Sequence, residues 1–164
     1  MDKKTKSVMK EILSYILIIL VVVLIRTYVG TPIKVSGSSM KPTLNGSEIM
    51  ILNKLDKKFT RNEVVVVKTK HGDIIKRVIA LPGETISVED GKIYINSRKV
   101  EDKFGYGTTN DFEKIELKDD EYFCMGDNRE DSMDSRYYGP FKKNVIKGST
   151  KFIIFPIKRI GNIK

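Results

Sequence analysis

The sequence is poor in cysteine and histidine, with one of each among its 164 residues. A single thiol, Cys124 in "EYFCMGDN", excludes an internal disulfide framework and a Cys-rich zinc site. Free cysteine usually packs as a small apolar side chain, so we expect Cys124 to fill space on a strand. The one histidine, His71 in "KTKHGDII", stands beside a Gly-Asp pair typical of a turn, where an exposed side chain is more common than a catalytic one. A Ser-His-Asp triad is therefore not expected.

Motifs for phosphate and calcium binding are absent or incomplete. The sequence contains no G-x-x-x-x-G-K-[ST] phosphate loop. The acidic loop that starts at Asp127 fails as an EF-hand, because Ser132 stands where glycine is needed and Tyr138 where the bidentate glutamate belongs. We therefore expect no metal and no cofactor.

The chain also has no internal repeat, no low-complexity linker and no second helical domain, and its length suits either one modest core or a smaller core with an appendage. Its 30 basic and 21 acidic residues give a net charge of +9 and an isoelectric point near 9.5. Such a charge suits an anionic partner, either nucleic acid or a lipid surface. Composition alone does not choose between the two.

One long apolar run is present near the N-terminus, from Ile12 to Ile25, after a lysine-rich start. As a helix its 14 residues rise about 21 Å, less than a hydrocarbon core of roughly 30 Å. Arg26 can extend its charged end to the interface, and Tyr28 and Val29 can lie there, which lengthens the span. The lysines predict a cytoplasmic N-terminus, with the rest of the chain outside.

A cleaved secretory signal is the rival interpretation of this run. Cleavage needs small residues at positions one and three before the cut, and "RTYVGTPIKV" offers only Gly30 with Tyr28 before it, or Val29 with Thr27 before it. An uncleaved anchor is favoured over a signal and over a buried soluble helix. The predicted organisation is a cytoplasmic tail over 1–10, a transmembrane anchor over 11–30 and an extracytoplasmic domain over 31–164.

The remainder of the chain shows period-two alternation and short apolar runs broken by turn residues, which predict a mainly β domain. The expected strands are "EIMILNKL", "EVVVVKTK", "DIIKRVIAL", "TISVEDGKIYI", "EYFCM" and "STKFIIF". Asp90-Gly91 is typical of a two-residue hairpin turn, and Pro82-Gly83 of a type II turn. The segment "NREDSMDSRYYGP" is expected to be a long polar loop.

The serine cluster in "VSGSSMKPTL" and one lysine carry candidate chemistry. Serine hydroxyls before a Lys-Pro turn suit either plain loop chemistry or a nucleophile, and without a usable histidine the next candidate base is a desolvated lysine. Lys76 lies mid-strand on the face of Ile74 and Val78, while Arg77 points to the opposite face. Lys76 is open to two interpretations, a buried base or an edge-strand lysine that prevents aggregation.

Three segments together, "SGSSMKPTL", "IKRVIALPGE" and "MGDNREDSMDSRYYGP", follow the apolar run in this order. In this combination the chain resembles type I signal peptidase in its short, single-anchor bacterial form, a Ser/Lys-dyad serine peptidase. The later run "FIIFPIKRIG" is similar to the closing strand of that family. The resemblance covers most of the chain and implies an antiparallel β-sheet or half-barrel domain, of the signal-peptidase and self-cleaving-repressor type.

This resemblance implies catalytic roles that the residues alone do not assign. Ser39 matches the nucleophile, which the sequence alone does not separate from Ser36 or Ser38. Lys76 matches the general base, and Ser132 matches a hydroxyl that hydrogen-bonds and orients the lysine. The oxyanion hole of the family uses the backbone N–H of the nucleophile and a donor two residues earlier, so Gly37 would contribute a backbone N–H.

Further positions match supporting residues. Asp134 and Arg136 match a structural ion pair near the site, with Arg77 and Asp127 as additional supports. The chain departs from the family pattern at Asn62-Glu63, where Gly-Asp is usual, and it lacks the second β domain of longer members.

The resemblance also implies the substrates, which are secretory preproteins with small residues at positions one and three before the cut. The expected pocket walls are Val35, Met40, Leu44 and Ile75, with the substrate strand added to an exposed β edge. The positive charge then favours anionic membrane lipid over nucleic acid as a partner. Two alternatives remain at this point, another Ser/Lys peptidase of the same fold and a non-enzymatic, membrane-tethered β module that binds peptides or lipid.

Overall fold

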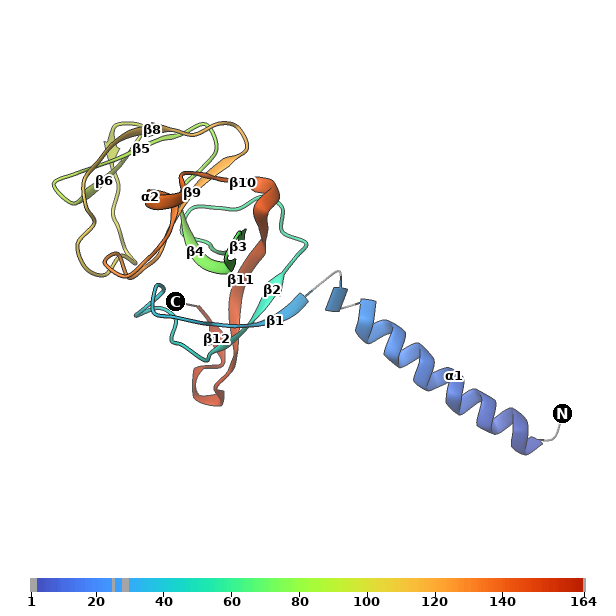
Figure 1. Cartoon of the computed structure of the whole chain (residues 1–164). Helices are drawn as coiled ribbons and strands as arrows, with labels where there is room; N and C mark the ends of the chain where they lie inside the picture. Colours follow the sequence, from blue (N-terminus) through green and yellow to red (C-terminus); the bar gives the residue numbers. More distant parts are fainter. Residues whose placement is uncertain (1–2, 25, 28–29, 164) are drawn as a thin grey trace.

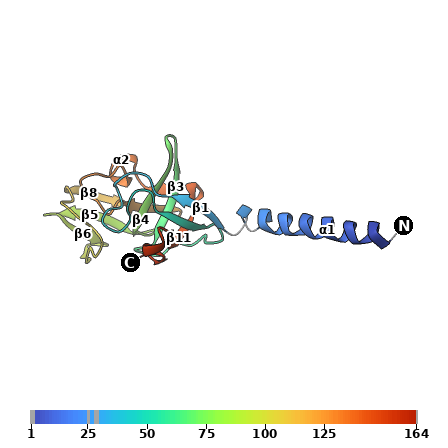
Figure 2. The same ribbon diagram turned by 90° about the horizontal axis from the view of Figure 1, so that it is seen from below.

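The computed structural model describes residues 3–24, 26–27 and 30–163. Its first element is helix α1 (Lys3–Leu24), which extends away from the rest of the chain in both views (Figures 1 and 2). Its 22 residues rise about 33 Å, so the helix is longer than the apolar run alone predicted. The window Ser7–Leu24 has a mean hydropathy of 2.3 and is not buried against the protein, which fits a membrane span. Ile25, Tyr28 and Val29, which the sequence assigned to the end of the anchor, lie outside the described residues.

The larger sheet has the strand order β1-β2-β11-β3-β4-β9-β10, and β12 pairs with β11. All of its pairings are antiparallel. Its strands are β1 (Gly30–Lys34), β2 (Ile49–Asn53), β3 (Val64–Thr69), β4 (Gly72–Ala80), β9 (Glu121–Met125), β10 (Phe141–Lys142), β11 (Ile146–Phe155) and β12 (Gly161–Asn162).

A smaller antiparallel sheet has the order β7-β6-β5-β8. Its strands are β5 (Thr85–Glu89), β6 (Lys92–Ile95), β7 (Arg98–Lys99) and β8 (Phe112–Glu116). Asp90 and Gly91 join β5 to β6 with positive φ angles of 50° and 69°, as the predicted hairpin turn requires. Gly83 likewise has a φ of 76°, which suits the predicted type II turn.

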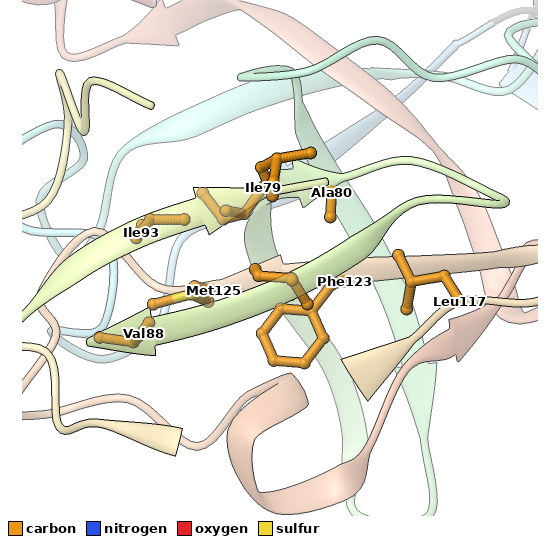
Figure 3. Packing of buried hydrophobic residues seen from close by; sticks show 9 residues of the cluster. Ile79, Ala80, Val88, Ile93, Leu117, Phe123 and Met125 are labelled. Carbon is orange, nitrogen blue, oxygen red and sulfur yellow. The ribbon is translucent and has the colours of Figure 1, made fainter. Parts of the chain in front are cut away.

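Strand β4 contributes to three apolar clusters, and this explains its nearly continuous hydrophobic sequence. Ile79 and Ala80 pack with the smaller sheet and with Phe123 and Met125 of β9 (Figure 3). Val78 belongs to a second cluster that also contains Cys124, whose burial raises the pKa of its thiol. A third cluster gathers Val35, Met40, Leu44, Met50, Val64 and Ile153, with Ile75 packed against it.

Two partly open strand edges lie in the larger sheet. The first five residues of β4, Gly72–Lys76, pair with β3 on one side, whereas pairing with β9 begins at Arg77. Strand β1 is the terminal strand of the sheet and pairs with β2. A further strand can therefore add beside β4 or β1 without displacing an existing one.

These elements confirm the mainly β, antiparallel fold with one N-terminal apolar helix. The six predicted strand segments match β2, β3, β4, the β5–β6 hairpin, β9 and β11. The sequence analysis did not predict β1, β7, β8, β10 or β12. The predicted polar loop also contains a short helix, α2 (Ser135–Tyr138), and the 3-10 turns η2 (Lys143–Val145) and η3 (Ile157–Arg159) flank β11.

Candidate active site

Lys76 on β4 and Ser39 in the turn after β1 meet at the centre of the site. The Nζ atom of Lys76 lies 2.7 Å from the Oγ atom of Ser39, a hydrogen-bond distance. Lys76 is only 3% exposed, so it is a buried lysine and not a solvated edge-strand lysine. Burial lowers the pKa of Lys76, and the positive charge of Arg136 lowers it further, although the carboxylate of Asp134 opposes this shift.

The three serines of the cluster have different surroundings. Ser36 is exposed, and the hydroxyl of Ser38 donates to the carboxylate of Asp131. Ser39 is the serine whose hydroxyl contacts the buried lysine. The geometry therefore separates Ser39 from its neighbours, which the residues alone did not do.

Hydrogen bonds from the opposite loop hold the backbone around Ser39. The backbone N–H of Asn128 donates to the carbonyl oxygen of Ser39 at 3.0 Å, and its side-chain amide donates to the carbonyl oxygen of Ser38 at 3.4 Å. Gly37 has a φ of 83°, a left-handed conformation that favours glycine. Within the described chain, the backbone N–H groups of Gly37 and Ser39 donate to no protein acceptor, and both residues line the cleft.

Asp134 organises the loop beside Lys76. Its buried carboxylate accepts hydrogen bonds from the N–H of Gly126 at 2.9 Å and the hydroxyl of Ser132 at 2.6 Å, and it pairs with Arg136 at 2.9 Å. Burial alone would raise the pKa of Asp134, but these hydrogen bonds and the charge of Arg136 lower it overall. The predicted ion pair is therefore present.

The position of Ser132 differs in detail from the expectation. Its hydroxyl donates to Asp134, and among the described residues the hydrogen bond of Lys76 goes to Ser39. The reason is chemical, because a carboxylate is a stronger acceptor for a hydroxyl than an amine group that is already in contact with Ser39.

Arg77 and Asp127 form a second buried ion pair. The guanidinium donates to both carboxylate oxygens, at 2.8 Å and 2.6 Å, and the two side chains are 3% and 0% exposed. Arg77 also donates to the carbonyl oxygen of Asn62 at 2.7 Å, and its guanidinium carbon lies 3.7 Å from the ring centre of Phe104. Arg77 thus joins β4 to the loop after β9 and to the loop before β8.

Sequence reasoning missed the contribution of that second loop. Asp102 pairs with the buried guanidinium of Arg129, which also donates to the carbonyl oxygen of Gly126 at 2.9 Å. The N–H of Tyr106 donates to the carbonyl oxygen of Asp127 at 2.7 Å. Arg129 lies in the quoted segment "MGDNREDSMDSRYYGP", but the sequence analysis gave it no role, and Asp102 and Tyr106 carry no local signal.

The surroundings of Asn62 and Glu63 explain why this pair can replace the Gly-Asp that is usual in the family. Asn62 has a φ of 70°, a conformation that glycine adopts freely and asparagine tolerates better than most residues. Glu63 is buried, and its carboxylate accepts from the N–H of Thr60 at 2.9 Å and pairs with Lys151 at 2.9 Å. A Glu-for-Asp replacement thus keeps a carboxylate at this turn.

A cleft of about 160 Å³ adjoins Ser39 and Lys76. Its walls come from β1 with the residues that follow it and from the open part of β4, and they include three of the predicted pocket residues, Val35, Met40 and Ile75. The fourth predicted wall residue, Leu44, was predicted wrongly. It does not line the cleft and has no exposed surface, because its side chain packs in the third apolar cluster.

Comparisons with known proteins agree with this geometry. Residues 8–155 match the family model described as signal peptidase, peptidase S26. A signal peptidase I of Bacillus amyloliquefaciens is 36% identical over 98% of this chain and 95% of the relative, and signal peptidase I S of Bacillus subtilis is 34% identical over 96% and 94%.

A crystal structure of a signal peptidase I from Enterococcus faecalis is similar, with a TM-score of 0.51 and 27% identity over 56% of this chain and 96% of that chain. The non-enzymatic alternative does not fit these relatives, which carry the name of an enzyme over nearly the whole length of the chain. The chain therefore belongs to the signal peptidase family, peptidase S26, and is a serine peptidase that removes signal peptides.

Proposed function

We propose that the chain is a membrane-anchored endopeptidase in which Ser39 is the nucleophile and Lys76 is the general base. The observation that carries this proposal is the 2.7 Å contact between the Ser39 hydroxyl and an amine that is 3% exposed. Burial favours the neutral amine, and only a neutral amine can accept the serine proton.

The reaction then follows the chemistry of acyl transfer. Neutral Lys76 accepts the proton as the Ser39 oxygen bonds to the scissile carbonyl carbon, and the resulting ammonium returns that proton to the departing amine. An acyl-enzyme remains. Lys76 next takes a proton from water, the hydroxide adds to the ester carbonyl, and the proton returns to Ser39 as the acid product leaves.

Backbone donors stabilise the charged intermediate. The N–H groups of Gly37 and Ser39 are the proposed oxyanion hole, a kind of site that commonly contributes a few kcal/mol per donor. Ser132 is the proposed orienting hydroxyl. Because it donates to Asp134, its lone pairs remain available to accept from Lys76 when the lysine becomes an ammonium.

Substrate binding is proposed to occur by addition of a strand between the two open edges. The open part of β4 and the end of β1 both line the cleft beside Ser39, which suits β-augmentation. A cleft of about 160 Å³ admits small side chains at the cut, with Val35, Met40 and Ile75 as walls. The proposed substrates are secretory preproteins cut after a small-x-small sequence such as Ala-x-Ala.

The proposed topology places residues 1–10 in the cytoplasm, an anchor over 11–30 in the bilayer and the domain 31–164 outside. The lysines before the apolar run support this orientation. Anionic lipid is the proposed counterpart of the net positive charge.

Cleavage of a preprotein by detergent-solubilised variants tests the dyad. Lys76→Arg keeps the charge but cannot lose its proton in a working pH range, so we expect a folded, inactive protein. Ser39→Ala is expected to be inactive and folded as well, whereas Ser38→Ala and His71→Ala keep activity. Substantial turnover by Lys76→Arg, or processing that survives Ser39→Ala and is lost in Ser38→Ala, contradicts the proposal.

A further inference from the structure

A groove of about 860 Å³ lies away from the catalytic cleft, between the β3–β4 turn and the segment from α2 to η2. Figure 2 shows this turn projecting from the body of the domain. Phe141 and Val145, which are buried and half-buried, provide an apolar floor. The basic side chains that line the groove are Lys68, Lys70, His71 and Lys142.

The charge of this groove is not neutralised by its own walls. Its described lining contains no carboxylate, and Lys68, Lys70 and Lys142 form no ion pair with the residues that the structure describes. Asp73, which follows the turn, pairs with Lys147 at 2.5 Å. An apolar floor below three unpaired ammonium groups is complementary to a peptide segment that carries an acidic side chain.

The groove continues from the strand edge on which the substrate is proposed to bind. Residues Gly72–Lys76 of β4 have an open edge, and the groove begins with the residues directly before them, Lys68–His71. Lys76 and His71 are five residues apart, about 16 Å along an extended strand. A substrate strand on this edge therefore arrives at the groove about five residues from its scissile bond.

We propose that the groove is a substrate subsite for an acidic side chain about five residues from the scissile bond. This proposal rests on the function proposed above and adds a preference that the catalytic cleft does not provide. A lipid headgroup is the less suitable occupant, because the groove contributes only Tyr138 to the exposed large apolar side chains, whereas several lie together at the end of β11 and on or next to η3, including Phe155, Ile157 and Ile160.

A peptide series measures this preference with the full chain in an uncharged detergent. Starting from one cleaved neutral peptide, a single aspartate is placed in turn at positions three to eight on either side of the cut, with asparagine at the same position as reference. We expect one position, about five residues from the cut, at which aspartate raises kcat/KM about fivefold over asparagine, as two partly screened ion pairs would give. The effect should decrease with salt.

Variants of the groove separate it from a general effect of charge. The double variant Lys70→Gln/Lys142→Gln should lose the preference and keep the rate on the neutral peptide. The double variant Lys92→Gln/Lys99→Gln makes the same charge change on exposed residues of the smaller sheet and should keep the preference.

Equal rates for aspartate and asparagine at every position in the wild type overturn the proposal, as does a preference that persists in Lys70→Gln/Lys142→Gln. If the wild type shows no preference for aspartate and the variant Lys70→Gln/Lys142→Gln loses binding to phosphatidylglycerol vesicles, the groove is a lipid site and the proposal is overturned. Cleavage of the neutral peptide distinguishes failure of the groove proposal from failure of the proposed function. If only the groove proposal is wrong, the neutral peptide is still cleaved, whereas if the Ser39–Lys76 dyad is wrong, it is not.

Discussion

At the residue scale, Lys76 is a buried ionisable group with consequences for both activity and stability. Its pKa is lowered in the folded protein, chiefly by burial, so between that value and the ordinary lysine value the unfolded chain binds more protons than the folded one. Stability therefore rises with pH across this window. Activity should rise in the same direction, because the base must be neutral.

A Lys76→Met variant tests the stability consequence. Removing the buried lysine should stabilise the domain by roughly 1 kcal/mol near neutral pH, and this advantage should shrink as the pH approaches the ordinary lysine pKa, where the unfolded chain also loses its proton. Thermal unfolding followed by circular dichroism at about pH 7 and about pH 10 measures it. An advantage of Met that is the same at both pH values would show that burial does not penalise the charged lysine.

Asp131 offers a second test of the same base. Its carboxylate accepts a hydrogen bond from Ser38 and raises the pKa of Lys76, partly opposing the effect of burial. Asp131→Asn should therefore move the acid limb of kcat/KM to lower pH. Glu130→Gln is the matched control, because it removes a charge next in sequence on a side chain that bonds to the N–H of Thr108. Equal displacement of the limb in both variants would attribute the effect to net charge.

The resemblance of three segments to the signal peptidase family selected the central residues, which the residue pattern alone left open, and the remaining contacts depend on distant parts of the chain. Ser39, Lys76 and Asp134 are each embedded in a recognisable segment, and the structure brings all three together. Asp102 has no such segment. Its contact with Arg129 exists only because the loop before β8 folds over the loop after β9, a juxtaposition that local patterns do not encode.

At the element scale, the loop after β9 requires glycine for close packing against the nucleophile turn. A Cβ atom on Gly126 would overlap the hydroxyl of Ser132 and the carbonyl oxygen of Ser39. We expect Gly126→Ala to displace Ser39 from Lys76 and to lower kcat by at least about tenfold, because misplacement of reacting groups by 1 Å can cost about 100-fold.

Gly46→Ala provides the control in the neighbouring turn. Its Cβ atom would make only an ordinary contact with the carbonyl oxygen of Gly37, at 3.8 Å, and its backbone has no positive φ. This variant should retain the wild-type rate of preprotein cleavage. If Gly126→Ala were equally active, the two loops would be less tightly packed than the structure indicates.

Strands with a long apolar pattern were predicted correctly, whereas very short strands that exist only through hydrogen bonds to a neighbouring strand were missed. The runs that became β3 and β4 carry several branched residues in succession, and both strands are mostly buried. β10 and β12 have only two residues each and exist through their pairing with β9 and β11. α2 has four residues and begins at the side-chain cap of Asp134, whose carboxylate the site also uses.

At the scale of the whole molecule, the β domain contacts the residues that follow helix α1. The ammonium of Lys54, in the loop after β2, donates to the carbonyl oxygens of Arg26 and Thr27 at 3.4 Å and 3.2 Å. A lysine at such carbonyl groups is favourable, since helix ends leave them without intrahelical donors. β1 begins at Gly30 and leads within nine residues to Ser39, so the nucleophile lies close in sequence to the proposed membrane surface.

The orientation of the whole chain gives the last prediction. The lysine-rich start and the single apolar helix predict that residues 31–164 lie outside the cytoplasm. Protease added to intact spheroplasts should digest that region and leave a small N-terminal fragment, while a cytoplasmic marker protein stays intact. A short epitope placed before Lys3 identifies the fragment on a blot. A catalytic domain that is protected until lysis would reverse the topology, and Ser39 would then have no access to preproteins emerging on the outer side.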